Sequence, residues 1–304
     1  MGYLRRAAVL AIVPAVITTL VTTAQAAATP SDDHTVPGMN QWASCRPSSV
    51  HPRPVVLVHG NGSGLTDTWT PLAAALSRDG YCVFGLEYGR HTAGSDENLL
   101  DVPGGADIRQ SAKVLATFVE RVLAATDANQ VDIVGHSMGA LTARQYLKAE
   151  GGTNRENPSG NVVHTLITLG GTNQGTTFDN NKSIRDEAVS MGLPADGAIA
   201  AAVGPSYSQQ MVGSSFIEGL NRGGDTLAGV GYVAIASMDD GIITPPESAF
   251  LTANDGAGVQ NVWVQGGCPG LRVDHMALTT TPRALWLVQT ALDPSHGAQP
   301  APCP

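Results

Sequence analysis

Short apolar runs recur along the chain at intervals that suit the strands of a buried sheet. Runs of about four to eight apolar, often β-branched residues, bounded by Gly, Pro or polar residues, are typical of such strands. We expect six of them, at residues 54–58, 81–86, 131–134, 162–169, 229–236 and 259–265.

Between several of these runs, apolar residues recur every three or four positions, which is typical of amphipathic helices. The clearest case is residues 106–125, whose apolar positions would face the sheet: Ile108, Ala112, Leu115, Val119 and Val122. Further helices are expected at 69–78, with Pro71 in the first turn, at 140–147, and at 282–292, which a proline opens. Strands that alternate with helices predict an α/β domain with a doubly wound, mostly parallel sheet.

Residues 171–228 separate the fourth expected strand from the fifth and are rich in Gly, Asn, Ser and Thr. A loop of that length without structure of its own is unusual in a compact domain. We therefore expect a cap or lid insertion with short elements. Its apolar stretch at 198–203 could line a pocket, form a lid helix or pack away against the body.

The first residues have the three parts of a secretory signal peptide. Two arginines precede an apolar run at 7–21, and an Ala-Gln-Ala cleavage pattern follows. The run is short for a membrane span and Pro14 interrupts it, so we expect a cleaved leader at 1–28 rather than stable membrane insertion. The mature chain, 29–304, would then be a single secreted, extracellular domain.

The charge and the cysteines narrow the partners and the compartment. The formal charge is −9, and removal of the two leader arginines makes it more negative. No basic run offers a footprint for phosphates, so nucleic acid is not an expected partner. The chain has four cysteines without metal-ligand spacing, and in an exported protein they are expected to form two disulfides. Four cysteines allow three pairings, and the sequence alone does not select one.

Residues Gly135-His136-Ser137-Met138-Gly139 lie between an expected strand and an expected helix. This is the setting of a nucleophile elbow, in which flanking glycines let the backbone turn sharply and lift a serine hydroxyl above the sheet. The motif alone is a weak filter in a chain with 35 glycines, where a tight turn is the simpler interpretation. Whether Ser137 is a nucleophile therefore depends on whether the chain also offers the other residues of a catalytic site.

A nucleophilic serine needs a general base, and the base needs an acid that orients it. In folds with this elbow, the acid follows a later strand and the histidine follows the last one. His275 comes after the final expected strand, whereas His296 lies in a Pro- and Gly-rich tail. Asp239 and Asp240 follow the fifth strand, and we expect one to face the histidine and the other to be solvated or to cap the turn. Asp274, next to the histidine, is poorly placed to reach its ring. Of the two adjacent carboxylates we choose Asp240 as the acid.

A site for acyl transfer also needs N–H donors directed at the developing oxyanion. The backbone N–H of Met138, at the start of the expected helix, provides one, and the helix dipole favours negative charge there. For the second donor we assign the backbone N–H of Asn61, in the glycine-rich loop after the first strand. That loop lacks the Lys of a phosphate-binding loop and the acid of a dinucleotide site. His59, at its start, is expected to brace the loop rather than act as a base.

Five blocks occur in order along the chain: HPRPVVLVHG, GYCVFGLEYG, ADIRQSAKVLATFVERVLAATDANQVDIVGHSMG, DDGIITPPESAF and CPGLRVDHMAL. Together they resemble the secreted bacterial lipases and esterases of the lipase class 2 family, which are α/β-hydrolases. The resemblance covers roughly residues 42–303 and is weakest at 176–210. In this family the acid is the Asp of an Asp-x-hydrophobic-hydrophobic-Thr-Pro block, which is Asp240 here. Two positions near the expected pocket depart from the family, Met138 in place of a frequent Gln and Gln174 in place of a frequent His.

The resemblance implies hydrolysis of carboxyl esters, either acylglycerols or simple acyl esters, without a cofactor or a metal. We expect Ser137, His275 and Asp240 to form the catalytic triad of a monomer that acts on lipid or ester substrates, also at an oil–water interface. Two alternatives stay open. One is a polyester depolymerase or cutinase-like hydrolase, which a short or absent lid would favour. The other is a secreted binding protein on a catalytically inactive hydrolase fold.

The expected strands also suggest how the cysteines pair. Cys82 lies in the second strand, and Cys45 lies in the segment that enters the neighbouring first strand, so a disulfide between them would attach that segment to the sheet. Cys268 would then pair with Cys303. That second disulfide would tie the C-terminal tail to the loop that carries His275.

Overall fold

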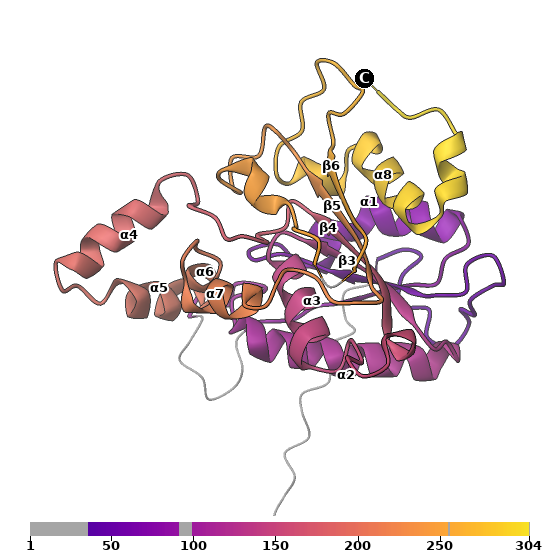
Figure 1. Cartoon of the computed structure of the whole chain (residues 1–304), viewed down its shortest axis with the longest axis horizontal. Helices are drawn as coiled ribbons and strands as arrows, with labels where there is room; N and C mark the ends of the chain where they lie inside the picture. Colours follow the sequence, from indigo (N-terminus) through magenta and orange to yellow (C-terminus); the bar gives the residue numbers. More distant parts are fainter. Residues whose placement is uncertain (1–35, 91–98, 255, 304) are drawn as a thin grey trace, which may run out of the picture.

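The computed structural model describes residues 36–90, 99–254 and 256–303. At its centre lies a six-stranded sheet in which all neighbouring strands are parallel, in the order β2-β1-β3-β4-β5-β6 (Figure 1). The strands are β1 (Val55–Val58), β2 (Val83–Leu86), β3 (Val131–His136), β4 (Val163–Leu169), β5 (Gly231–Ala236) and β6 (Val259–Trp263). Each overlaps one of the expected runs. The expected signal peptide lies outside the described residues.

Two pairs of helices cover the two faces of the sheet. Helices α2 (Ile108–Thr126) and α3 (Met138–Ala149) pack on one face, and α1 (Leu65–Arg78) and α8 (Pro282–Leu292) pack on the other (Figure 1). The strand order reverses at β1, because the chain moves outward from β1 to β2 and then returns to place β3 on the other side. The α/β fold with a doubly wound parallel sheet is therefore confirmed.

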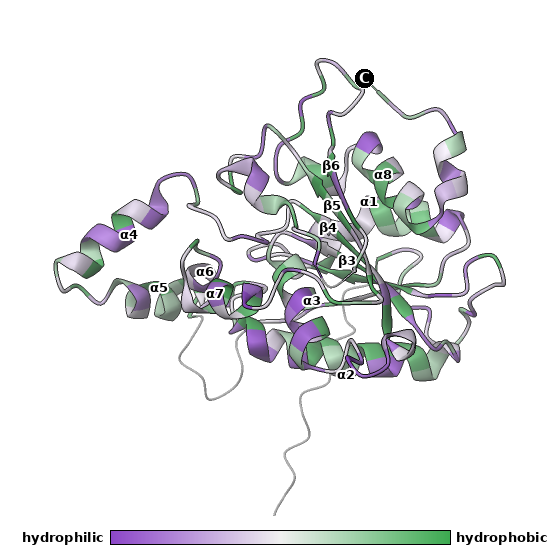
Figure 2. Cartoon of the chain, in the orientation of Figure 1, coloured by the Kyte–Doolittle hydropathy of each residue, from purple (hydrophilic) through white to green (hydrophobic). Residues whose placement is uncertain are grey.

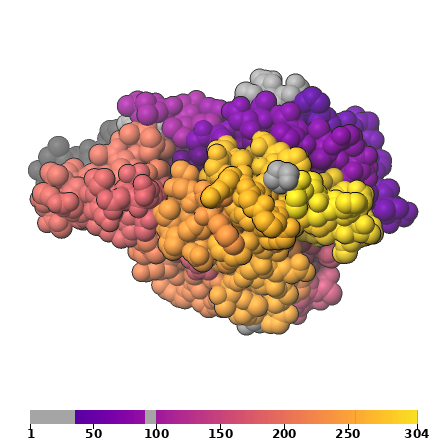
Figure 3. All heavy atoms as spheres, turned by 90° about the horizontal axis from the view of Figure 1, so that it is seen from above, coloured from indigo at the N-terminus to yellow at the C-terminus, as the bar shows by residue number. Residues whose placement is uncertain are grey.

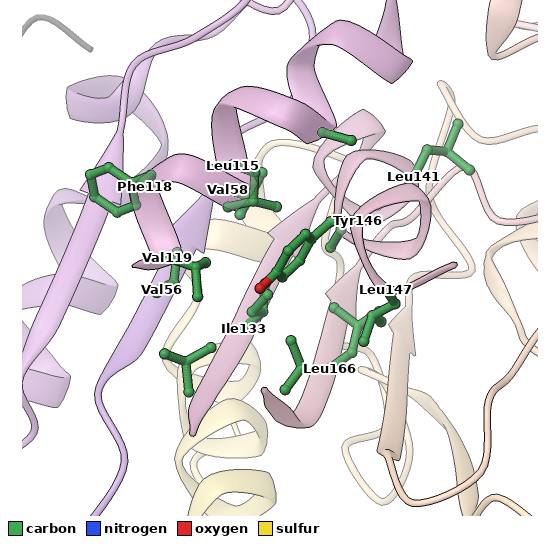
Figure 4. Packing of buried hydrophobic residues seen from close by; sticks show 14 of the residues in the cluster. Val56, Val58, Leu115, Phe118, Val119, Ile133, Leu141, Tyr146, Leu147 and Leu166 are labelled. Carbon is green, nitrogen blue, oxygen red and sulfur yellow. The ribbon is translucent and has the colours of Figure 1, made fainter. Parts of the chain in front are cut away.

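The apolar face of α2 packs on the sheet as its periodicity predicts. Figure 4 shows Leu115, Phe118 and Val119 of this helix near Val56 and Ile133 of the strands. All five recurring apolar residues of the helix are buried. Figure 2 shows the same division for the whole molecule, with hydrophobic residues concentrated in the strands. Each fully buried side chain of this kind contributes about 1.5–3 kcal/mol, so this face is what joins the helix to the sheet.

Helix α1 begins about one turn earlier than expected, and Pro71 lies inside it rather than in its first turn. The sequence analysis was wrong here because the start of the helix depends on a residue distant in sequence. A carboxylate oxygen of Glu87, just after β2, accepts the backbone N–H of Leu65 at 2.9 Å. Negative charge is favourable at the N-terminus of a helix. Gly64 permits this approach, because a Cβ there would lie 3.0 Å from both carboxylate oxygens.

Four helices lie between β4 and β5, where the insertion was expected. They are α4 (Asn181–Ser190), α5 (Ala195–Val203), α6 (Ser206–Gln209) and α7 (Ser215–Asn221). Helices α4 and α5 form an arm, residues 181–203, that projects from the body in two perpendicular views (Figures 1 and 3), and neither helix contains a buried residue. The stretch 198–203 forms the end of α5, where the carbonyl oxygens of Ala201 and Ala202 accept the backbone N–H groups of Leu99 and Leu100.

Two disulfides join segments that are distant in sequence. Cys45 pairs with Cys82 at a Cα–Cα distance of 5.6 Å, and Cys268 pairs with Cys303 at 5.4 Å. The first attaches the segment before β1 to the edge strand β2, which the same segment also contacts through a bridge between Met39 and Val83.

The remaining helical turns are short. The described residues include 3-10 helices at Pro158–Gly160, Pro246–Ala249, Ala277–Thr279 and Pro294–Ala298. Of the helices in the described ranges, none is both long enough and apolar enough to cross a membrane.

Candidate active site

The loops that follow β1, β3, β5 and β6 meet at the carboxyl end of the sheet. In doubly wound sheets, ligands bind at this end, near the point where the strand order reverses. Here that point lies between β1 and β3, whose loops carry Asn61 and Ser137. Strand β5 leads to Asp240, and β6 leads to His275. The topology therefore brings the expected site residues to one edge of the sheet.

Ser137 joins β3 to α3 in a strained backbone conformation, with φ 54° and ψ −124°. Positive φ is uncommon for a residue other than glycine, and a sharp, strained turn is typical of a nucleophile elbow. Both flanking glycines are required by close packing. A Cβ on Gly135 would lie 2.8 Å from the backbone nitrogen of Ala140, and a Cβ on Gly139 would lie 2.1 Å from the carbonyl oxygen of Val58.

Asp240 and His275 form a buried pair. Oδ2 of Asp240 lies 2.7 Å from Nδ1 of His275. The other carboxylate oxygen, Oδ1, accepts the backbone N–H groups of Ile242 and Ile243, each at 2.8 Å. These bonds fix the carboxylate, and only 5% of Asp240 and 6% of His275 is exposed. When Nδ1–H donates to the carboxylate, the neutral ring carries its lone pair on Nε2, which is the arrangement a general base needs.

The end of β4 lies against both the serine and this pair. The carbonyl oxygen of Leu169 accepts the backbone N–H of Ser137 at 2.9 Å. At the next residue, Gly170, a Cβ would lie 3.1 Å from Nδ1 of His275 and 3.2 Å from Oδ2 of Asp240. Gly170 also has a φ of 51°, which favours glycine. The three residues predicted as a triad therefore converge on one turn of the chain.

Asp239 is partly exposed, and it bonds to the loop after β6 instead of only meeting solvent or capping its own turn. Its carboxylate accepts hydrogen bonds from Arg272, from Gln265 and from the backbone N–H of Val273. The bond from Arg272 is the main cause that lowers the pKa of Asp239. The buried hydroxyl of Ser237 donates to the carbonyl oxygen of Val273 and accepts from Gln265. These residues tie the loop after β5 to the loop after β6.

Asn61 lies in the turn after β1, beside the elbow. A Cβ on its neighbour Gly60 would lie 2.9 Å from Cβ of Ser137. The side-chain amide of Asn61 donates to the hydroxyl of Ser206 at 2.8 Å, which holds the turn. Among the described residues, the backbone N–H of Asn61 and that of Met138 have no acceptor. Two such N–H groups beside the serine, one of them at the positive end of α3, are suited to bind an oxyanion.

His59 is fully buried and braces the loop after β1. Its Nδ1 donates to the carbonyl oxygen of Gly60 at 2.8 Å, and its Nε2 accepts the backbone N–H of Tyr88 at 3.3 Å. Burial lowers the pKa of His59, and this effect outweighs that of the nearby Glu87, which raises it. The residue is therefore a neutral structural histidine, as expected.

The remaining candidates of the sequence analysis make no hydrogen bond to the Asp240–His275 pair in the part of the chain that the structure describes. Asp274 accepts the backbone N–H of Ala277 at 2.8 Å and so caps the turn after the histidine. His296 lies in the 3-10 helix that follows α8. Gln174, expected near the pocket, donates to Asp225 at 2.7 Å and to a backbone carbonyl. Within the described ranges, no three His, Cys, Asp or Glu side chains form a group that could hold a metal ion.

The sequence analysis gave no role to three residues that contact the site. Ser237 and Gln265 connect the two loops after β5 and β6, and no local pattern marks them. His136 stands inside the elbow motif, and its Nε2 lies 3.1 Å from the carbonyl oxygen of His275. The histidine directly before the expected nucleophile is a signal in the sequence that could have pointed to this contact.

Comparison with known proteins adds independent evidence. Residues 52–263 match the family model Lipase (class 2). Triacylglycerol lipases from Pseudarthrobacter phenanthrenivorans and Burkholderia plantarii are each 30% identical to this chain over 130 residues, or 41% of the chain, and the match spans only 34% and 31% of their own lengths. The crystal structure of Aspergillus fumigatus lipase B aligns with this chain at a TM-score of 0.58 and 22% identity. The alignment covers 81% of this chain and 55% of the lipase B chain.

The structural likeness shows a shared fold, and the family match goes further. It runs from just before β1 to the last residue of β6, and so includes every strand of the sheet, the Ser137 elbow and Asp240. The chain therefore belongs to the class 2 lipase family and has the α/β-hydrolase fold.

Proposed function

We propose that the protein is a secreted serine carboxyl-ester hydrolase that cleaves acylglycerols or simple acyl esters. The observation that carries the proposal is the buried Asp240–His275 pair, packed with the strained Ser137 around Gly170. A hydrogen-bonded acid and histidine beside a serine held at positive φ form the arrangement that activates a hydroxyl nucleophile.

In this mechanism, Ser137 attacks the carbonyl carbon of the ester while Nε2 of His275 takes its proton. The tetrahedral intermediate collapses, the bond to the alcohol breaks, and the histidine returns the proton to the leaving alcohol. A water molecule then cleaves the acyl-enzyme by the same route. Asp240 holds the ring orientation and stabilises the imidazolium that forms in each step.

The backbone N–H groups of Asn61 and Met138 would bind the negative oxygen of the tetrahedral intermediate. The amide of Met138 opens α3, where the helix dipole favours negative charge. The hydrogen bond between Asn61 and Ser206 connects Asn61 to the insertion, so the position of the Asn61 donor depends on the cap. Removing one such donor typically costs about a hundredfold to a thousandfold in kcat.

The domain organisation and the setting complete the proposal. A leader at 1–28 directs export, and residues 29–304 form one domain with a cap at about 171–228, acting outside the cell as a monomer on lipid or ester substrates. The relatives named as triacylglycerol lipases support this substrate class. A polyester depolymerase would be favoured by a short or absent cap, and the four helices of the insertion do not support it.

Replacing the nucleophile tests the proposal. Ser137→Ala should lower the hydrolysis of soluble p-nitrophenyl esters by more than about a thousandfold, because no acyl-enzyme can form. Esters of increasing chain length, with and without an oil interface, define the substrate range. A p-nitrophenyl phosphonate should label the wild type at Ser137 alone.

The control is Ser190→Ala, at the exposed end of α4, which should keep wild-type activity and labelling. Circular dichroism checks that both variants are folded. If the Ser137→Ala protein keeps more than about a thousandth of wild-type activity, the triad assignment fails. A wild type that hydrolyses no ester and takes up no phosphonate would identify an inactive binding protein instead.

A further inference from the structure

His136, the residue before the expected nucleophile, is joined to the expected base. The side chain is 1% exposed, and its Nε2 lies 3.1 Å from the backbone carbonyl oxygen of His275. The two imidazole rings are 4.7 Å apart between centroids, and the ring of Trp69 lies nearly perpendicular to that of His136, with centroids 6.4 Å apart. The ring is therefore held in place, and it is too deeply buried to contact substrate.

The chemistry of this contact fixes the proton on His136. A carbonyl oxygen can only accept, so Nε2 must carry the hydrogen. Burial lowers the pKa of His136 well below its usual value, with a further contribution from His275, so the ring is neutral and Nδ1 carries none. Nδ1 has no partner among the described residues, and a Cβ on Gly60 would lie 3.4 Å from it. A second proton would find no acceptor there.

Side-chain hydrogen bonds, the Cys268–Cys303 disulfide and the burial of Val273 hold the segment that carries His275. Between the end of β6 and the 3-10 helix at Ala277–Thr279 there is no regular secondary structure to fix it. Ser237 and Asp239 hold the segment at Val273, two residues before the base. The bond from His136 is made to the base residue itself, and it comes from the residue adjacent to Ser137 in sequence.

We propose that His136 is a positioning residue that sets the distance and orientation of His275 relative to Ser137. The inference rests on the proposed triad. The bond ties the backbone of the base to the nucleophile elbow, so a shift of the loop after β6 cannot move the base away from the serine. A neutral ring at this position also avoids a like charge beside the imidazolium that forms during catalysis.

Three substitutions separate positioning from packing. His136→Leu removes the donor. His136→Gln keeps an amide N–H at about the reach of Nε2, and His136→Asn places it too close to the backbone to meet the carbonyl oxygen. Because a misplacement of about 1 Å can cost a hundredfold in rate, we expect kcat to fall about tenfold to a hundredfold in His136→Leu and His136→Asn, with KM within about twofold. In His136→Gln most of this loss should be recovered.

The measurements use the full mature protein with a soluble p-nitrophenyl ester. A phosphonate titration counts the competent sites, so kcat refers to folded, reactive enzyme only. The matched control is Thr126→Val, which removes a buried hydrogen bond to Val122 on α2, away from the site. It should lower thermal stability without changing kcat per titrated site.

Two results would overturn the inference. One is an unchanged kcat per titrated site in His136→Leu. The other, decisive if the leucine variant does not fold, is equal rates in His136→Gln and His136→Asn. If either result is obtained and the wild type is labelled at Ser137, only the role of His136 is refuted. An active Ser137→Ala protein would instead refute the triad on which it rests.

Discussion

The body around the site and the projecting arm are held together in different ways, and two arginines show the contrast. Arg144 on α3 is buried, and its guanidinium donates to Asn221 at 2.7 Å and to the carbonyl oxygen of Asn173 at 2.9 Å. Arg185 joins α4 to α5 in the arm through a partly exposed pair with Asp196. The arm also leaves apolar side chains in solvent, whereas those of β1, β3 and β5 are buried.

This contrast teaches where the geometry of the site comes from. In the body, buried polar side chains such as Arg144 have partners on distant segments, so moving one element leaves buried polar groups unpaired, which costs about 1–3 kcal/mol each. In the arm, exposed ion pairs stabilise little. We therefore expect that the arm can differ in sequence without disturbing the expected catalytic groups.

The largest effect should come from the buried acid. Asp240→Asn keeps the shape but removes the charge that stabilises the imidazolium and fixes its tautomer. We expect kcat/KM on a soluble short-chain ester to fall at least about a hundredfold further than in Asp239→Asn, or roughly 2.7 kcal/mol of transition-state stabilisation. Asp239 is the natural control, because it is adjacent and bonds to the loop rather than to the ring. The reverse ranking would give the role to Asp239.

The two arginines test the comparison directly. Arg144→Gln should lower the free energy of unfolding by about 3–5 kcal/mol, because it leaves the nearby carboxylate of Asp225 buried without its charged partner. Urea unfolding at neutral pH measures this change. Arg185→Gln should shift the thermal midpoint by less than about 2 °C. If the two variants lose similar stability, the arm is as firmly built as the body.

Acid should destabilise the body before the arm. Burial lowers the pKa of His59 and of His136, so below about pH 6.5 the unfolded chain binds more protons than the folded one. Stability should therefore fall as pH falls, by about 1.4 kcal/mol per unit for each such histidine, and should not change from this cause above that pH. In the arm, hydrogen bonds from basic side chains lower the pKa of Asp186 and Asp196. Both carboxylates therefore keep their negative charge as the pH falls below about 6.5.

Urea unfolding at pH 7.5 and pH 5.5, at constant ionic strength, measures how the free energy of unfolding changes with pH. His136→Gln should reduce this change, because one of the two buried histidines is gone. Equal stability at the two pH values would show that these rings are not held neutral by the fold.

Local patterns predicted most of the sheet and the elbow because their causes are local. A buried parallel strand needs a short apolar run, and an amphipathic helix such as α2 needs its own periodicity. The elbow likewise needs its two glycines within five residues of sequence. Asp240 and His275 could be named because the order of strands fixes which loops reach the carboxyl end of the sheet.

The features that were missed have causes distant in sequence. The start of α1 depends on a carboxylate of Glu87, and the role of Asp239 depends on Arg272 and Gln265. Helices α4 and α7 lie in an insertion without a strong apolar period. For the start of α1 and for Asp239, contacts with remote segments decide the structure, and a pattern within one segment carries no trace of them.

The order of the site residues along the chain has a consequence for the cell that makes the protein. The elbow belongs to β3 and α3, whereas His275 belongs to a loop that is made much later, after β6. A serine hydroxyl without its base is a poor nucleophile. With the proposed triad, a chain that is still being synthesised, amino end first, has the serine before it has the histidine that would activate it.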